Sequence, residues 1–134
     1  MGKLQDFLME AQIGTTQTEV QIAPFPYPFI VKSITEAENK AIRKTCQKIE
    51  FDKKTRQKRI DTDTDLYNAR LVVACCVEPN FKDAALQEKY GVRGAEDLIN
   101  LILNPGQYTD LLLAVQEING VTSDVGELRD EAKN

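Results

Sequence analysis

The sequence predicts an α+β fold, mainly α, with about five to six helices, a small N-terminal antiparallel β-hairpin and a disordered C-terminal tail. Three observations predict it. Apolar residues recur at helical spacing through most of 35–119, strand-like alternation is confined to 19–34, and residues 121–134 are polar without periodicity. The 134 residues suffice for one domain, which we place at 19–120, after an N-terminal helix and linker at 1–18.

The N-terminal part is expected to begin with a short helix at 3–12, whose apolar side chains lie on one side. A linker rich in threonine and glutamine follows and reaches residue 18. The next residues alternate between polar and apolar, and three prolines within 24–28 then exclude helix and leave an extended turn. We therefore expect strand 19–23 to pair with a second strand at 29–34.

The rest of the domain is predicted to be helical. Thr35 and Glu38 have the spacing of a capping box, which starts a helix whose apolar face runs to Ile49. Residues 50–65 lack apolar periodicity and carry five bases and five acids, so an exposed loop or hairpin is expected there. The run 71–77 is apolar on every side, which places its helix in the middle of the fold. Further helices are expected at 83–90, 95–103 and 105–119.

The composition removes most enzyme classes. The chain has no histidine, which excludes Ser-His-Asp and Cys-His catalysis and histidine metal sites. Its net charge of −4 lacks the basic balance that is typical of binding to duplex DNA or anionic membranes. Cys46, Cys75 and Cys76 match no disulfide framework or zinc spacing, and the acids at 61–65 lack the glycine and glutamate of a calcium loop. We expect a soluble, cytosolic protein without signal peptide or membrane span, and predict no catalytic residues, no cofactor and no metal.

Two segments raise the alternative of nucleic-acid binding. Residues 83–103 have the helix-turn-helix spacing of DNA-binding proteins, but they carry four acids against two bases, the wrong sign for meeting phosphates. The bases at 53–59 form a dense patch without an aromatic residue for base stacking, and acids flank it. A solvated loop or a docking site for an acidic protein is favoured there. A small helix-turn-helix-like regulator remains the second hypothesis, with no nucleic acid expected as a partner.

Several short blocks follow one another in order between about residues 30 and 120. They are Ile34–Asn39 with Arg43–Cys46, Leu71–Val73 through Pro79, Leu86-Gln87 with Tyr90–Val92 and Gly94-Ala95, Leu103 with Pro105-Gly106 and Tyr108, and Val115–Gly120. In this order the blocks resemble the XkdN-like tail assembly chaperone family of tailed phages, prophages and phage-tail-like elements. The first 25 residues and the loop at 50–62 carry little of the resemblance.

The resemblance implies a small, acidic, non-catalytic protein of the host bacterial cytoplasm that is absent from the mature virion. It implies binding to the tape measure protein and recruitment of tail tube subunits during tail morphogenesis. The expected partners are therefore the tape measure protein and the tail tube protein, with self-association left open and no membrane expected.

The family supplies no residue-level binding motif, so candidate contacts come from the residues themselves. Aromatic residues alternate with the prolines of the turn, where they either dock into a partner or, as we favour, cover one edge of the core. In the later helices, some apolar side chains lie outside the face that is expected to pack on the core. These side chains either bind a partner or pack against a second part of the core. The candidate partner-binding residues are Phe25, Tyr27, Phe29, Leu101, Tyr108, Leu113, Lys53, Lys54 and Arg56.

Overall fold

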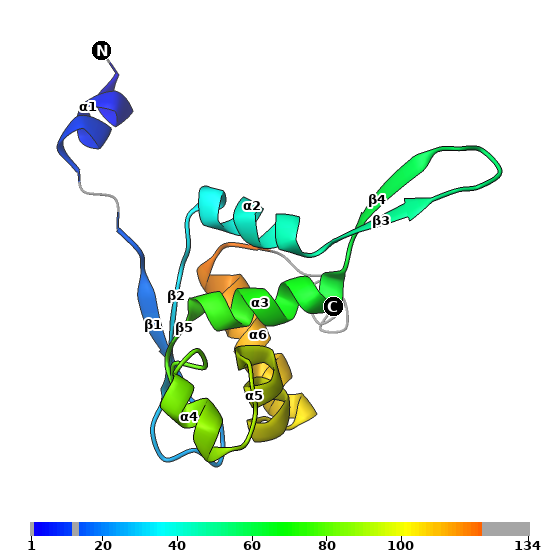
Figure 1. Ribbon diagram of the computed structural model, residues 1–134. Helices are drawn as coiled ribbons and strands as arrows, with labels where there is room; N and C mark the ends of the chain where they lie inside the picture. Colours follow the sequence, from blue (N-terminus) through cyan, green and yellow to red (C-terminus); the bar gives the residue numbers. More distant parts are fainter. Residues whose placement is uncertain (1, 12–13, 122–134) are drawn as a thin grey trace, which may run out of the picture.

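The computed structural model describes residues 2–11 and 14–121 (Figure 1). Within these ranges the chain forms six helices and five strands in two separate sheets. In chain order the elements are α1 (Lys3–Glu10), β1 (Gln17–Val20), β2 (Phe29–Lys32), α2 (Glu36–Thr45), β3 (Gln47–Phe51), β4 (Lys58–Thr62), α3 (Thr64–Cys75), β5 (Cys76–Glu78), α4 (Ala84–Lys89), α5 (Ala95–Ile102) and α6 (Pro105–Ile118).

The predicted fold class is wrong, because strands are not limited to one N-terminal hairpin. The described residues form a mixed α+β fold in which β5 joins β1 and β2, while β3 and β4 make a second sheet. β5 has only three residues and follows α3 directly. Because the run 71–77 is apolar throughout, it has no alternating pattern that would distinguish this strand from the end of the helix. The predicted disordered tail, 121–134, lies outside the described residues except for Val121.

β2 is the middle strand of the three-stranded sheet and pairs antiparallel with both neighbours. Val20 lies opposite Phe29, so the strand pair predicted around the proline turn is present with shifted bounds. On the other side Val31 lies opposite Cys76, next to an irregularity in the register. Phe29 and Val31 point to the same face, as alternate residues of a strand do, and both are buried.

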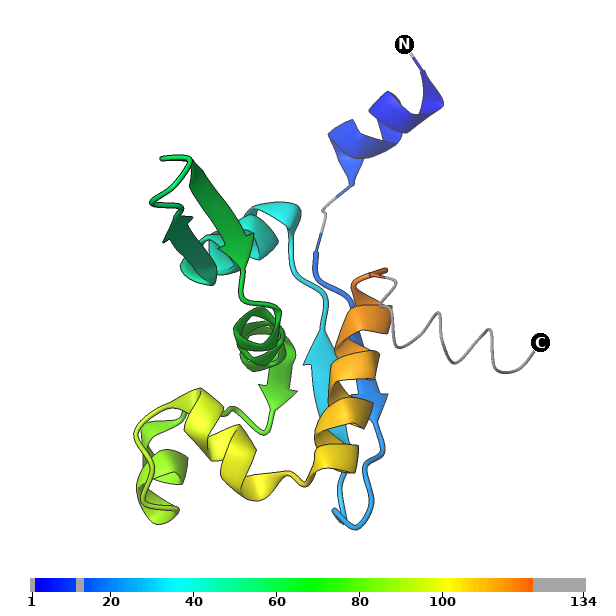
Figure 2. The ribbon, with the colours of Figure 1, turned by 90° about the vertical axis from the view of Figure 1, so that its right-hand side faces the viewer.

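α3 lies in the middle of the fold, as its all-round apolar run predicts (Figure 2). It packs against α2, α5, α6 and β5, while α6 lies along β1 and β2. The core therefore joins β2, β5, three helices and the two loops that hold Ile22 and Phe81. Its fully buried large side chains are Val31, Leu71, Val72, Phe81, Leu98, Ile99, Leu111 and Val115.

The starts of α2 and α6 are fixed by local hydrogen bonds. The Thr35 hydroxyl accepts the backbone N–H of Glu38, whose carboxylate accepts the Thr35 N–H, which is the predicted capping box. Asn104 and Gln107 form the same reciprocal pair at α6. These bonds satisfy N–H groups that have no partner within the helix.

The Asp63 carboxylate at the start of α3 is expected to make stability depend on pH. Its Oδ1 accepts the backbone N–H of Leu66 at 3.3 Å, and its Oδ2 lies 3.5 Å from Lys48 Nζ. The Leu66 N–H foremost, and then Lys48, hold the pKa of Asp63 below its ordinary value of 3.8. Since the pKa is lower in the folded chain, this stabilisation is present above pH 3.8 and is lost as the pH falls through the folded pKa.

Thermal unfolding of the wild type and of Asp63→Asn across the acid range checks this expectation. Asparagine keeps the capping oxygen but does not titrate, so the variant should lose less stability than the wild type on acidification. Identical pH profiles for the two proteins would contradict the assignment.

Two elements stand apart from the rest of the molecule. α1 has no buried residue, and the hairpin of β3 and β4 extends into solvent (Figures 1 and 2). We call residues 47–62, which comprise this hairpin and its turn, the arm. The view in Figure 1 places α1 and the arm on opposite sides of the molecule.

Candidate partner-binding surfaces

The arm has two different faces. Its register places Ile49 opposite Ile60 and Phe51 opposite Lys58, and side chains directly opposite one another point to the same face. Ile49, Phe51 and Ile60 therefore share a face, where they are 62%, 63% and 58% exposed. The side chains of the other face are all charged: Lys48, Glu50, Arg59 and Asp61. A sheet this small with an open apolar face is a candidate binding surface.

The turn of the arm is basic and locally ordered. The Asp52 carboxylate accepts the backbone N–H of Lys54 at 2.9 Å, and its backbone carbonyl accepts the N–H of Arg56 at 2.8 Å. The Lys54 N–H foremost, and then the Thr55 hydroxyl, lower the pKa of Asp52. Residues 47–62 hold six bases and three acids, net +3, in a chain of net −4. The predicted candidates Lys53, Lys54 and Arg56 therefore lie together on a basic element of an acidic protein.

The second uncovered apolar surface is one side of α1. Leu4, Phe7 and Leu8 are 70%, 59% and 52% exposed, and their spacing places them on the same side of the helix. Lys3 and Glu10 flank this stripe on the side of Phe7, whereas Asp6 lies on the opposite side of the helix. An isolated helix of eight residues is shorter than the roughly 12–15 residues that give even marginal stability in water, so α1 lacks the packing that ordinarily stabilises such a helix.

The aromatic residues of the proline turn divide between core and surface. Phe25 packs edge-on against Phe29 with ring centroids 5.1 Å apart, and Phe29 is only 3% exposed. Tyr27 is 79% exposed. Phe25 and Phe29 thus cover an edge of the core, which is the interpretation favoured from the sequence, whereas Tyr27 presents its ring to solvent.

The three candidates on the last helices are also not equivalent. Leu101 on α5 is 56% exposed. Tyr108 and Leu113 on α6 are half-buried, and burial raises the pKa of Tyr108. Tyr108 packs against the core, so the larger free surface among the three belongs to Leu101.

The segment with helix-turn-helix spacing consists of α4, a turn at Gly91 and α5. Gly91 has φ +68°, the left-handed conformation that ends many helices. α5 turns Leu98 into the core, and its first turn carries Glu96 and Asp97. Arg70 of α3 holds Glu96 in an ion pair of 3.2 Å. Acidic side chains at the start of the second helix repel phosphates, and this geometry favours a packing role.

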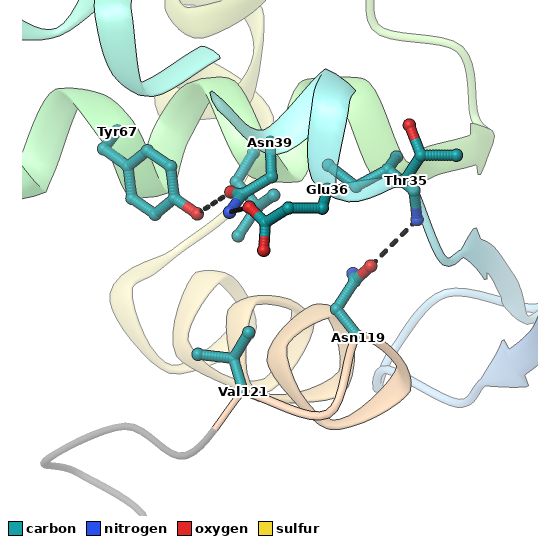
Figure 3. A pocket seen from close by; sticks show the side chains of 8 residues that line it. Thr35, Glu36, Asn39, Tyr67, Asn119 and Val121 are labelled. Atoms are coloured by element: carbon teal, nitrogen blue, oxygen red, sulfur yellow. Dashed lines mark hydrogen bonds between the residues drawn. The ribbon is translucent and has the colours of Figure 1, made fainter. Parts of the chain in front are cut away.

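A pocket of about 240 Å³ opens where α2, α3 and the end of α6 meet (Figure 3). The Tyr67 hydroxyl donates to the Asn39 side chain, which in turn donates to the Glu36 carboxylate at 2.9 Å. Across the pocket, Asn119 Oδ1 accepts the backbone N–H of Ile34 at 2.9 Å. These polar groups are used to join the elements around the pocket, so it serves as a junction within the fold.

Replacing Asn119 with alanine is expected to lower the free energy of unfolding by about 1–3 kcal/mol. The side chain also donates to the Val115 carbonyl at 2.8 Å and lies 3.5 Å from Cys75 Sγ. Alanine leaves the part-buried N–H of Ile34 without its acceptor. Urea unfolding measures the loss, with Asn100→Ala on the exposed side of α5 as the matched control. Equal stability of the two variants would contradict the role of Asn119.

The cysteines are buried thiols. Cys46, Cys75 and Cys76 are free and buried, and burial raises the pKa of Cys75 and raises that of Cys76 to about 12. A thiol with a raised pKa holds little of the reactive thiolate near neutral pH. The pair, Cys75 in α3 and Cys76 in β5, therefore contributes apolar packing in the core.

Within residues 2–11 and 14–121, no group of three or more His, Cys, Asp or Glu side chains is placed to hold a metal ion. In that part of the chain no helix has both the length and the apolar character that crossing a bilayer requires.

The apolar face of the arm is missing from the residues that the sequence predicts. Ile49 was expected on the face of a helix, but α2 ends at Thr45 and Ile49 belongs to β3. The available signal is the alternation of charged and apolar residues around Ile49, repeated around Ile60. Each of these two alternating stretches is short. Because the basic turn separates them, the sequence alone does not indicate that they pair as strands.

An open apolar sheet face beside a basic turn, together with an uncovered helix, is typical of a protein that acts by binding other proteins. Comparison with known protein families identifies the family within this class of binding proteins. The model of the phage XkdN-like tail assembly chaperone family matches residues 4–133, and the chain belongs to this family.

Individual relatives agree with this assignment. Over 108 residues, 80% of this chain, it is 30% identical to the phage-like element PBSX protein XkdN of Bacillus subtilis strain 168, of which the match covers 72%. It is 32% identical to the YqbN protein of the same strain, with the same coverage of both chains. The crystal structure of YqbN superposes with a TM-score of 0.68 at 25% identity, covering 87% of this chain and 95% of that chain.

Proposed function

We propose that this protein binds the tape measure protein during tail morphogenesis and recruits tail tube subunits around it. It acts by non-catalytic protein contacts in the host bacterial cytoplasm and is absent from the mature virion. In this proposal residues 19–120 form the chaperone domain, and residues 1–18 form a helix with its linker.

Membership of the tail assembly chaperone family carries the proposal. The exposed side chains of Tyr27 and Leu101 support it, because a chaperone that keeps an aggregation-prone partner in solution must offer apolar surface on a charged body. The net charge of −4 supplies such a body.

Co-expression with the tape measure protein from the same phage element tests the proposal. An affinity tag on the tape measure protein should retain this chain, and the tape measure protein should be soluble only when both are present. Light scattering of the purified complex then gives the number of chaperone copies on each tape measure chain. An insoluble tape measure protein, with this chain eluting alone, would contradict the proposal.

Salt dependence separates this function from nucleic-acid binding. An apolar protein contact should persist between low and high salt, whereas binding to duplex DNA would weaken steeply as counterions are released. Labelled duplex DNA, titrated at the same salt concentrations, is the comparison ligand.

A further inference from the structure

We propose that α1 of one copy of this protein docks on the apolar face of the arm of a second copy. The two surfaces are of similar size and kind. Leu4, Phe7 and Leu8 form the exposed stripe of α1, and the arm exposes Ile49, Phe51 and Ile60. Both are uncovered within one copy, and burying each against the other would remove both from water.

The shapes of the two surfaces match a common way of building a protein core. A helix with one apolar stripe covers the apolar face of a sheet in many folds. Each element also lacks the packing that would stabilise it alone, since α1 has eight residues and a two-stranded hairpin is at best marginally stable in water. Docking would supply to each the layer that it lacks.

The net charges of the two elements are opposite. The side chains of α1 sum to −1, from Asp6, Glu10 and Lys3. Lys58 shares the apolar face of the arm with Phe51, and the arm as a whole is net +3, from six bases and three acids. Opposite net charges favour encounter and orientation more than they add affinity.

The partner is a second copy because of where the two surfaces lie. Figure 1 shows α1 and the arm on opposite sides of the molecule, with α2 and the rest of the fold between them. A second copy can bring its α1 to this arm while its own arm stays free. The contact is thus of the kind that joins different patches of two identical chains.

The expected association is weak and depends on concentration. One helix on a two-stranded sheet falls below the roughly 1,200 Å² that stable interfaces bury. Light scattering of the whole chain between about 10 μM and 1 mM should show an average mass that rises from the 15.1 kDa of one copy. Two double variants remove one surface each: Ile49→Ser with Ile60→Ser in the arm, and Phe7→Ser with Leu8→Ser in α1.

Each double variant alone should remain at the mass of one copy. A mixture of the two should regain association, because the intact α1 of the arm variant can dock on the intact arm of the α1 variant. The mixture should stop at twice the mass of one copy, since the remaining surfaces are both defective. Tyr90→Ser is the control, because Tyr90 is 43% exposed but belongs to neither surface, and it should associate like the wild type.

Three results would overturn the proposal. The first is a wild type that keeps the mass of one copy over the whole concentration range. The second is a double variant that associates as the wild type does. The third is a mixture of the two double variants that fails to regain association, which would mean that the arm receives its own α1 or a different protein. Circular dichroism of each variant establishes that the fold is kept, as all four residues lie outside the core.

Discussion

Replacing Phe81 with alanine is expected to lower the free energy of unfolding by about 3–5 kcal/mol. Phe81 is the largest fully buried side chain, with 0% of its surface exposed, although it lies in the loop between β5 and α4. Its removal leaves a cavity bordered by a close-packed core, which relaxes only in part. A domain of this size is stabilised by about 5–15 kcal/mol in total, so a large share of the stability depends on this one ring.

Urea unfolding followed by circular dichroism measures this loss. Phe81→Leu, which keeps most of the apolar volume, should lose clearly less than Phe81→Ala. Tyr27→Ala is the surface control and should change stability by no more than about 0.5 kcal/mol. If Phe81→Ala and Tyr27→Ala unfolded at the same urea concentration, Phe81 would not be a core residue.

Replacing Val31 with aspartate is expected to lower the free energy of unfolding by more than about 4 kcal/mol and to leave most molecules unfolded near neutral pH. Val31 lies in the middle strand of the sheet with 0% exposure. The core around it holds no buried polar or charged residue within the described part of the chain, so a carboxylate there would have neither water nor a partner.

The sign of the pH dependence identifies the cause. Burial would raise the pKa of the new carboxyl above its value of about 3.9 in the unfolded chain. The difference in the free energy of unfolding between Val31→Asp and the wild type should therefore be smallest below a pH of about 3.9 and should grow as the pH rises. Val77→Asp is the matched control, because Val77 lies in β5 of the same sheet and is 36% exposed. A deficit that does not change with pH would contradict desolvation as the cause.

The parts of the fold that the sequence predicts are those encoded by neighbouring residues. Thr35 with Glu38, and the apolar run of α3, are local patterns with one dominant structural outcome. β5 depends instead on pairing with a strand some 45 positions earlier, as in the pair Val31 and Cys76. Nothing within three residues specifies such a partner, so the strand is absent from the prediction.

The candidate surfaces show the same division. The bases of the arm are evident from composition alone, and the structure places Lys53, Lys54 and Arg56 in one turn. Which aromatic residues of the proline turn face the core depends on tertiary packing, and sequence spacing does not distinguish Phe29 from Tyr27. The apolar face of the arm follows only from the strand register, which pairs Ile49 with Ile60.

The central place of β2 has a consequence for how the protein is made. The ribosome releases the chain from its N-terminus, so β1 and β2 emerge before the elements that cover them. β5 is needed to complete the sheet, and the bond from the Ile34 N–H to Asn119 joins residues 85 positions apart. Until α6 has left the ribosome, Phe29 and Val31 remain in contact with water. The last step of folding therefore follows the synthesis of α6, and a nascent chain halted before α6 would expose these apolar side chains to the chaperones of the cell.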